Sequence, residues 1–168
     1  MSSEHFSRRT TMFTERFQSF VCEGDSITCE VAGFEIVARI VREDCTDRSD
    51  ERQDGFWPSL YSDAPGFIGP GPNHRQRFDE AQARAEEVMR AWRNDEWYYC
   101  GIVLSVALEG VTLETHAASL WGVEANYPGS DNAYLTEVAQ ELLPDALDAG
   151  RAAARRLCAA LETTGARA

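Results

Sequence analysis

The chain has 168 residues, of which 43% are hydrophobic and 26% are charged. This size and composition are typical of one globular domain with its own core, and they argue against a disordered or fibrous protein. We therefore expect a single domain over 1–168. The 28 acidic residues outnumber the 16 basic ones, all of them arginine, and give a net charge of −12. Such a charge argues against direct binding to nucleic acid and to anionic membrane surfaces.

The N-terminal segment, 1–26, is expected to dock on the domain through a short helix. Phe13, Phe17 and Phe20 recur at the spacing that lines one face of a helix over 11–21. The segment lacks the continuous apolar stretch of a secretory signal, and the chain has no run of about 20 apolar residues that could span a membrane. Five scattered cysteines favour reduced thiols. These observations predict a cytoplasmic protein.

A first β-hairpin is predicted over 27–42, where β-branched residues flank a turn at Gly33. The segment 43–75 holds four of the six prolines and shows no sustained periodicity, which predicts a long loop rich in Pro, Gly and Asp. Its aromatic residues indicate that part of this loop packs against the domain. A helix over 76–93 follows, with strong helix formers and an apolar stripe.

A second hairpin is predicted over 97–121, with its turn at Glu109-Gly110 and alternating apolar and polar residues after the turn. A last helix is expected to continue to about Leu161, with a break at Pro144 because proline removes a backbone donor. The elements together predict an α+β domain. Its antiparallel sheet of about four strands, formed by two hairpins, carries helices packed on one face.

The sequence holds no decisive catalytic signature. The histidines are isolated, and no phosphate-binding or nucleophile motif is present. Asp95, Glu96 and Glu124 are carboxylates that could hold a hard metal ion in a metal-dependent hydrolase. Acids in so acidic a chain more often mark a solvated face, so we expect no catalytic residue, no metal site and no cofactor.

The distribution of charge along the chain is more informative than any motif. Residues 94–150 hold ten acids and no arginine, whereas 1–93 hold 17 acids and 12 arginines, and 151–168 hold one acid and four arginines. If the second hairpin and the last helix pack together, carboxylates from both can form one broad acidic surface. The predicted partner-binding residues on it are Glu109, Glu114, Glu124, Asp131, Glu137, Glu141, Asp145 and Asp148.

Two interpretations of this surface are open. Rows of carboxylates present negative charge to the Arg/Lys grooves that neutralise phosphates, so the surface can act as a decoy for a nucleic-acid-binding protein. Acidity also simply keeps a protein soluble. The aromatic residues at 97–99 and Trp121 allow a similar choice between core packing and anchoring a partner, including a second copy of the chain.

Three motifs carry a resemblance to known proteins. They are NDEW at 94–97, SLWGVE at 119–124 and YLTEVAQEL at 134–142. On these motifs the chain resembles, over about 27–150, a family of small uncharacterised proteins encoded by bacteriophages, prophages and plasmids. The resemblance implies no catalytic residue, and the chain departs from the family pattern at Pro144 and in its Pro-rich loop.

An origin in mobile elements gives weight to the decoy interpretation by association, since fold and family alone do not establish chemistry. We therefore predict a non-enzymatic inhibitor of a host defence complex, of the CRISPR or restriction type. Its partner would be a host protein with a basic nucleic-acid-binding groove. The alternatives are the metal-dependent hydrolase and a phage structural or assembly accessory.

Overall fold

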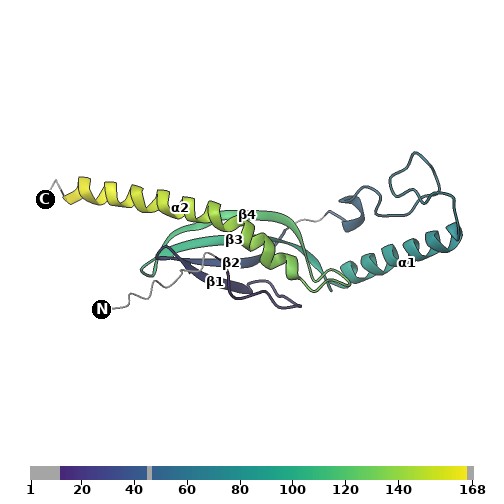
Figure 1. The fold of residues 1–168 in the computed structure, drawn as a ribbon, viewed down its shortest axis with the longest axis horizontal. Helices are drawn as coiled ribbons and strands as arrows, with labels where there is room; N and C mark the ends of the chain where they lie inside the picture. Colours follow the sequence, from purple (N-terminus) through teal and green to yellow (C-terminus); the bar gives the residue numbers. More distant parts are fainter. Residues whose placement is uncertain (1–11, 45–46, 166–168) are drawn as a thin grey trace, which may run out of the picture.

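The computed structural model describes residues 12–44 and 47–165, and its centre is a four-stranded antiparallel sheet (Figure 1). The strands follow one another in the order β1-β2-β3-β4. Their bounds are β1 Ser26–Val31, β2 Phe34–Arg42, β3 Tyr98–Leu108 and β4 Val111–Ala125. The predicted α+β class with two hairpins is confirmed, and β4 continues four residues beyond the predicted end of its hairpin.

Both hairpin turns use two residues with positive φ. Ala32 and Gly33 join β1 to β2 with φ of 53° and 84°, and Glu109 and Gly110 join β3 to β4 with φ of 49° and 75°. Positive φ at both central residues is the type I′ geometry, whose twist matches that of the flanking strands. The turns therefore set the registers in which Val31 pairs with Phe34 and Leu108 pairs with Val111.

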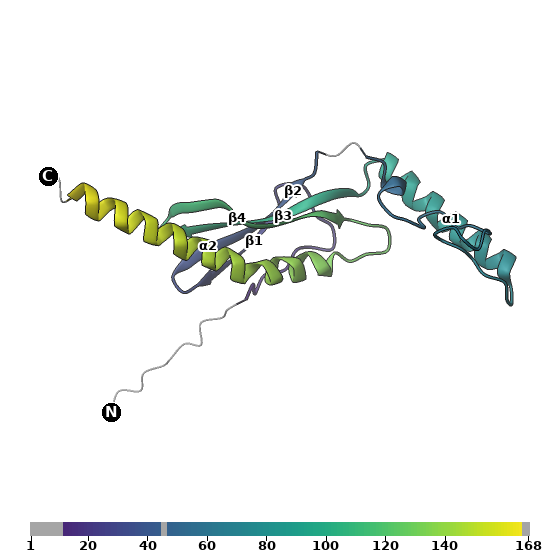
Figure 2. The ribbon, with the colours of Figure 1, turned by 90° about the horizontal axis from the view of Figure 1, so that it is seen from above.

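Helix α2, Ala133–Gly165, lies across one face of the sheet (Figures 1 and 2). Because side chains alternate along a strand, one set from β2 and β3 points at the helix and is fully buried. The core residues of the sheet are Ile36, Ala38, Ile40, Ile102 and Leu104, and those of the helix are Leu135, Ala139, Leu143 and Ala146. Beyond Ala153, the last residue of the helix to be buried, α2 continues with its side chains largely exposed, and Leu161 is 71% exposed.

The predicted break at Pro144 is wrong, because α2 runs without interruption from Ala133 to Gly165. Proline costs the helix the hydrogen bond that its N–H would have donated one turn back. Leu143 and Ala146, which flank Pro144, are buried against the sheet, and Pro144 itself faces solvent. The packing of the neighbouring turns thus holds the helix together across the missing donor.

The N-terminal segment docks on the domain, but not as the predicted helix over 11–21. Residues 12–21 form no helix, and the part of the expected helix at residue 11 lies outside the described residues. Phe13, Phe17 and Val21 are buried in the core, whereas Phe20 is exposed. The backbone N–H groups of Phe13 and Phe17 donate to Gln140 Oε1 at 3.0 Å and Thr136 Oγ1 at 3.1 Å. Side-chain oxygens of α2 thus accept the backbone hydrogen bonds of this segment and hold it against the domain.

The connection from β2 to helix α1, and α1 itself (His74–Arg93), extend from the end of the sheet that lies opposite the two hairpin turns (Figure 2). A short helix, η1, Ser49–Glu51, lies in the connection. A second apolar cluster joins α1 to β3 through the fully buried Trp97, whose indole N–H donates to the Val88 carbonyl at 3.0 Å. Helix α1 therefore packs on its own connection and on the sheet's end, while α2 covers the sheet.

In the described part of the chain, no helix combines the length and the apolarity needed to cross a bilayer.

Candidate functional site

Three of the predicted partner-binding carboxylates form a row on the outer side of α2. Glu137, Glu141 and Asp145 follow one another one helical turn apart, and all three are exposed. Among the described residues, none of the three takes part in an ion pair or hydrogen bond. Asp148 continues the row, but it binds Arg151 of the same helix at 3.1 Å. We call Glu137, Glu141 and Asp145 the acidic row.

The remaining carboxylates are spread along β4, from the turn before it to its other end, and to the start of α2. Glu109 is in the turn at one end of β4, and Glu124 is near the other end, about 45 Å of strand away. A standard interface of about 800 Å² per partner is roughly 32 Å across, so the two cannot both lie well inside one. Glu114 is half-buried and binds Arg156 at 2.7 Å. Asp131 accepts a hydrogen bond from the backbone N–H of Ala133 at the start of α2.

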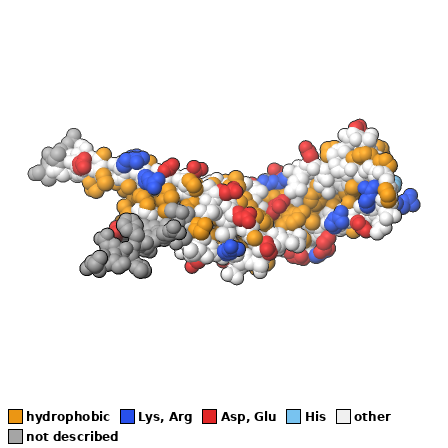
Figure 3. All heavy atoms as spheres, viewed as in Figure 1, with side chains coloured by type: hydrophobic (Ala, Val, Ile, Leu, Met, Phe, Trp, Pro, Cys, Tyr) orange, Lys and Arg blue, Asp and Glu red, His pale blue; other side chains and the backbone are white. Residues whose placement is uncertain are grey.

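The single broad acidic surface expected from the sequence is therefore not formed. Figure 3 shows Asp and Glu side chains spread along the molecule and interrupted by arginines. Two arginines of the C-terminal region, Arg151 and Arg156, neutralise Asp148 and Glu114. Arg16 of the N-terminal segment lines a surface depression together with Glu137 and Glu141 without pairing with either. Of the eight predicted carboxylates, those of the acidic row are the ones that lie side by side, exposed and without an arginine partner among the described residues.

The carboxylates considered for a metal ion are engaged separately. Asp95 binds Arg42, and Glu96 accepts from Arg90 at 3.0 Å. Glu124 lies on β4 and accepts a hydrogen bond from Gln53 at 2.9 Å. Within residues 12–44 and 47–165, no three His, Cys, Asp or Glu side chains converge as metal ligands would.

A mixed polar cluster, which we call the junction cluster, lies where the 43–57 connection meets the sheet. Arg52 donates to Glu43 at 3.1 Å, and its guanidinium carbon lies 3.8 Å from the centre of the Tyr99 ring. The next residue, Gln53, reaches Glu124, and the Ser49 hydroxyl lies 3.4 Å from that of Tyr99. One buried nitrogen of Arg52, Nη1, has no hydrogen-bond partner among the described residues. The cluster fixes the connection to the open face of the sheet.

Burial shifts two pKa values beside this cluster. Desolvation raises the pKa of the Glu124 carboxyl, with the Gln53 hydrogen bond and the Arg52 charge acting in the opposite direction. Desolvation also raises the pKa of Tyr127, and the nearby Glu124 adds to the effect. The Tyr127 phenol therefore stays protonated at neutral pH and remains able to donate a hydrogen bond.

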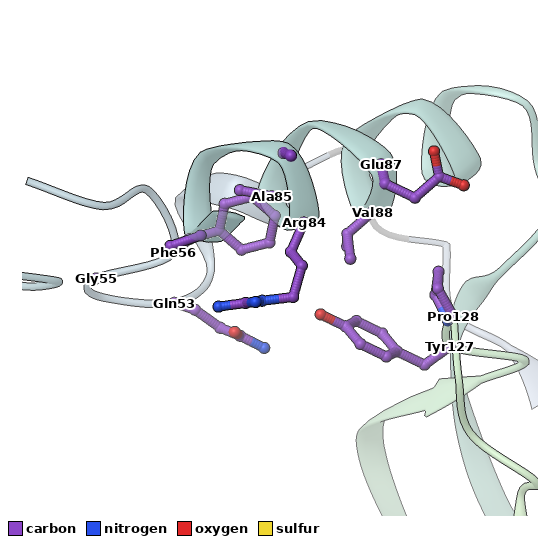
Figure 4. Close-up of a pocket in the computed structure, with 11 residues that line it drawn as sticks. Gln53, Gly55, Phe56, Arg84, Ala85, Glu87, Val88, Tyr127 and Pro128 are labelled. Atoms are coloured by element: carbon purple, nitrogen blue, oxygen red, sulfur yellow. The ribbon is translucent and has the colours of Figure 1, made fainter. Parts of the chain in front are cut away.

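A cleft of about 640 Å³ lies beside the junction cluster (Figure 4). Its walls come from three segments: the connection with Gln53 and Phe56, one side of α1, and the turn between β4 and α2 with Tyr127 and Pro128. The Tyr127 ring is held by Trp97, with ring centres 4.9 Å apart in an edge-to-face arrangement. Arg84 extends into the cleft between Gln53 and Tyr127 (Figure 4). This volume is within the range of small-molecule sites.

The fold and these two sites define an α+β protein with an acidic row in the first half of its covering helix and a cleft beside the turn that precedes this helix. In comparisons with protein-family models, curated proteins and solved structures, nothing matches this chain.

Sequence reasoning did not find Arg52, Arg84 or Tyr127. In the sequence, Arg84 resembles any other arginine of the predicted helix over 76–93, and the residues that follow Tyr127, Pro128 and Gly129, indicate only a turn. The aromatic residues of the connection did signal that it packs, but not against which partner. The sequence marks Glu124 only by its charge, whereas its half-burial results from the fold.

Proposed function

We propose that this protein is a non-enzymatic binding protein that places its acidic row on a basic, nucleic-acid-binding surface of a partner protein. The observation that carries the proposal is the exposed, unpaired line of Glu137, Glu141 and Asp145 on α2. Like charges at i, i+4 cost a helix a few tenths of a kcal/mol per pair. A partner rich in arginine or lysine would relieve that repulsion and gain charge-assisted hydrogen bonds.

The density of charge limits what the row can do alone. At 1.5 Å rise per residue, the three carboxylates are spaced about 6 Å apart over about 12 Å. One DNA strand carries a charge every 3.4 Å along the duplex axis, about twice that density. The row thus matches part of a phosphate-binding groove, and neighbouring surface must supply the remaining contacts. This favours a defined protein partner over a general affinity for basic molecules.

The resemblance to proteins of phages and other mobile elements suggests the partner. We propose a host defence complex, of the CRISPR or restriction type, that the protein inhibits in the host cytoplasm by occupying its nucleic-acid-binding groove. No observation favours the metal-dependent hydrolase, since Asp95, Glu96 and Glu124 are each engaged elsewhere. A phage structural or assembly accessory remains the alternative, and it predicts co-sedimentation with phage particles.

The test is the plating efficiency of a targeted phage on hosts that carry a defined CRISPR or restriction system and express the protein. We expect the wild type to restore plaques in at least one system. The variant Glu137→Gln/Glu141→Gln/Asp145→Asn should lose this protection. It should fold at least as stably as the wild type, because the neutralised row no longer repels itself.

A matched control removes the same amount of charge from α1. The variant Asp79→Asn/Glu80→Gln/Glu86→Gln neutralises three exposed carboxylates that lie outside the row. We expect it to protect as the wild type does. Equal loss in both variants would point to net charge rather than to the row, and protection by the row variant would refute the proposal.

A further inference from the structure

We propose that the cleft between α1 and the turn at Tyr127 and Pro128 binds a small organic anion with a flat apolar body, such as an aromatic carboxylate. The cleft lies at the opposite end of the sheet from the exposed end of α2. The residues that line it do not include Glu137, Glu141 or Asp145, so the inference rests on other side chains than the function proposed above.

The cleft exists because α1 presents small side chains to the connection. Ala81 and Ala85 lie one turn apart on α1, and Val88 continues the same side of the helix. Phe56 and Pro128 form apolar walls on either side of this floor (Figure 4). Figure 3 shows hydrophobic side chains gathered on the surface where the sheet gives way to α1. Such a lining favours the flat faces of an apolar molecule.

The polar groups in the cleft favour a negative charge on that molecule. Arg84 makes no ion pair or hydrogen bond within the described residues, although the chain is strongly acidic. Glu87, one turn further along α1, is a carboxylate that also lines the cleft, but its charge is paired with Arg90 at 2.7 Å and not with Arg84. Tyr127 adds a hydroxyl and Gln53 an amide beside the guanidinium (Figure 4). A guanidinium and neighbouring donors are the groups that bind carboxylates.

The cleft is held in shape before any ligand arrives. Trp97 is fully buried, fixes the Tyr127 ring from behind and is itself hydrogen-bonded to α1. Gln53 is held by its hydrogen bond to Glu124 in the junction cluster. Groups fixed in this way lose little conformational entropy on binding, which allows even a small ligand to bind measurably.

The test uses 2-naphthoate as the probe and its neutral analogue 2-naphthalenemethanol as the control ligand. Backbone amide chemical shifts of the full chain are followed by NMR during titration. We expect 2-naphthoate to bind with a dissociation constant of about 1 mM or tighter and to shift residues of the cleft. The neutral analogue should bind about ten-fold more weakly, since it lacks the charge that Arg84 binds.

Three variants separate the contributions. Arg84→Gln should abolish the preference for the anion and leave the neutral analogue unaffected. Ala81→Leu should fill the cleft and weaken both ligands. Arg75→Gln removes another exposed arginine of α1 that does not line the cleft, and it should bind as the wild type does. Absence of binding at several times this concentration, shifts centred away from the cleft, or an anion preference that survives Arg84→Gln would each overturn the proposal.

Discussion

On the sheet face opposite α2, the side chain of Trp121 leaves no room for a side chain at Gly101. The indole of Trp121 lies directly on Gly101 of the neighbouring strand, and a Cβ added to Gly101 would be 2.6 Å from the ring. Trp121 is nevertheless 45% exposed, because no helix of the described chain covers this face. A glycine here is required by the close approach of the ring rather than by a turn, since its φ lies in the ordinary range.

Gly101→Ala is therefore expected to lower the free energy of unfolding by about 1–3 kcal/mol, the usual cost of overpacking. In a Trp121→Ala background the same change should cost little, because the ring that the methyl group meets is gone. Urea unfolding of the four chains gives the coupling energy between the two sites. Equal cost in both backgrounds would mean that the two side chains do not meet.

Glu124 predicts a pH dependence of stability. Burial raises the pKa of its carboxyl above the ordinary value of 4.5. The folded state therefore binds this proton more tightly than the unfolded chain does. The stabilisation that results is fully present below about pH 4.5 and is lost as the pH rises through the raised pKa. Glu124→Gln removes this loss while keeping an oxygen for Gln53. Relative to the wild type, the variant should gain stability between acidic and neutral pH, and a constant difference across that range would contradict the burial of the charge.

At the scale of elements, the contact of α2 with β3 depends on Gly150. A Cβ added to Gly150 would be 2.6 Å from Val106 Cγ1 on β3. Alanine is preferred to glycine within a helix by about 1 kcal/mol, so propensity alone favours the substitution. The steric clash between the added methyl group and Val106 opposes the substitution. We expect its cost to be larger than the gain in helix propensity, because Gly150 and Val106 both lie in the packed core.

Gly150→Ala should consequently destabilise the protein by about 1–2 kcal/mol, net of the gain in helix propensity. In a Val106→Ala background the opposing methyl groups are gone, and there Gly150→Ala should raise the free energy of unfolding. Thermal or urea unfolding of the single and double variants is the measurement. Stabilisation by Gly150→Ala in the wild-type chain would show that α2 does not approach the sheet this closely.

The elements that sequence patterns predict well are those whose signal is local. The turn at Glu109-Gly110 and the helix α1 are encoded by turn residues and apolar periodicity within their own segments. The segment containing Phe13 and Phe17 has helical spacing, yet its backbone bonds to α2, which is more than a hundred residues away. The break predicted at Pro144 is wrong for a related reason, because the contacts of α2 with the sheet outweigh the local effect of proline.

The candidate sites were less predictable than the fold. Ten acids without an arginine in 94–150 predict carboxylates on α2, and the structure places Glu137, Glu141 and Asp145 on the exposed side of that helix. The expected surface also needed Glu109 and Glu124 beside them, and strand length places these two far apart. Nor could the sequence show that Arg156 would neutralise Glu114, because that pair forms only through the packing of α2.

The whole molecule is elongated, with α1 and the end of α2 at opposite extremes (Figure 1). Helix α2 alone, with its 33 residues, is about 50 Å long. A compact domain of 168 residues would have a radius of gyration of about 15 Å and a diameter of about 40 Å. Small-angle X-ray scattering of the monomer, separated by size and checked for mass, should give a radius of gyration clearly above 15 Å. A value at the compact limit would contradict the arrangement of α1.

On the scale of the whole molecule, we propose that one side of α2 competes with nucleic acid for a basic groove. The most direct measurement is the displacement of labelled DNA or RNA from a purified defence complex that the plating assay identifies. We expect the wild type to displace the nucleic acid. The variant Glu137→Gln/Glu141→Gln/Asp145→Asn should need a concentration at least about ten-fold higher, because a factor of ten corresponds to the loss of roughly one charged hydrogen bond. Simultaneous binding of protein and nucleic acid, or equal displacement by that variant, would contradict the proposal.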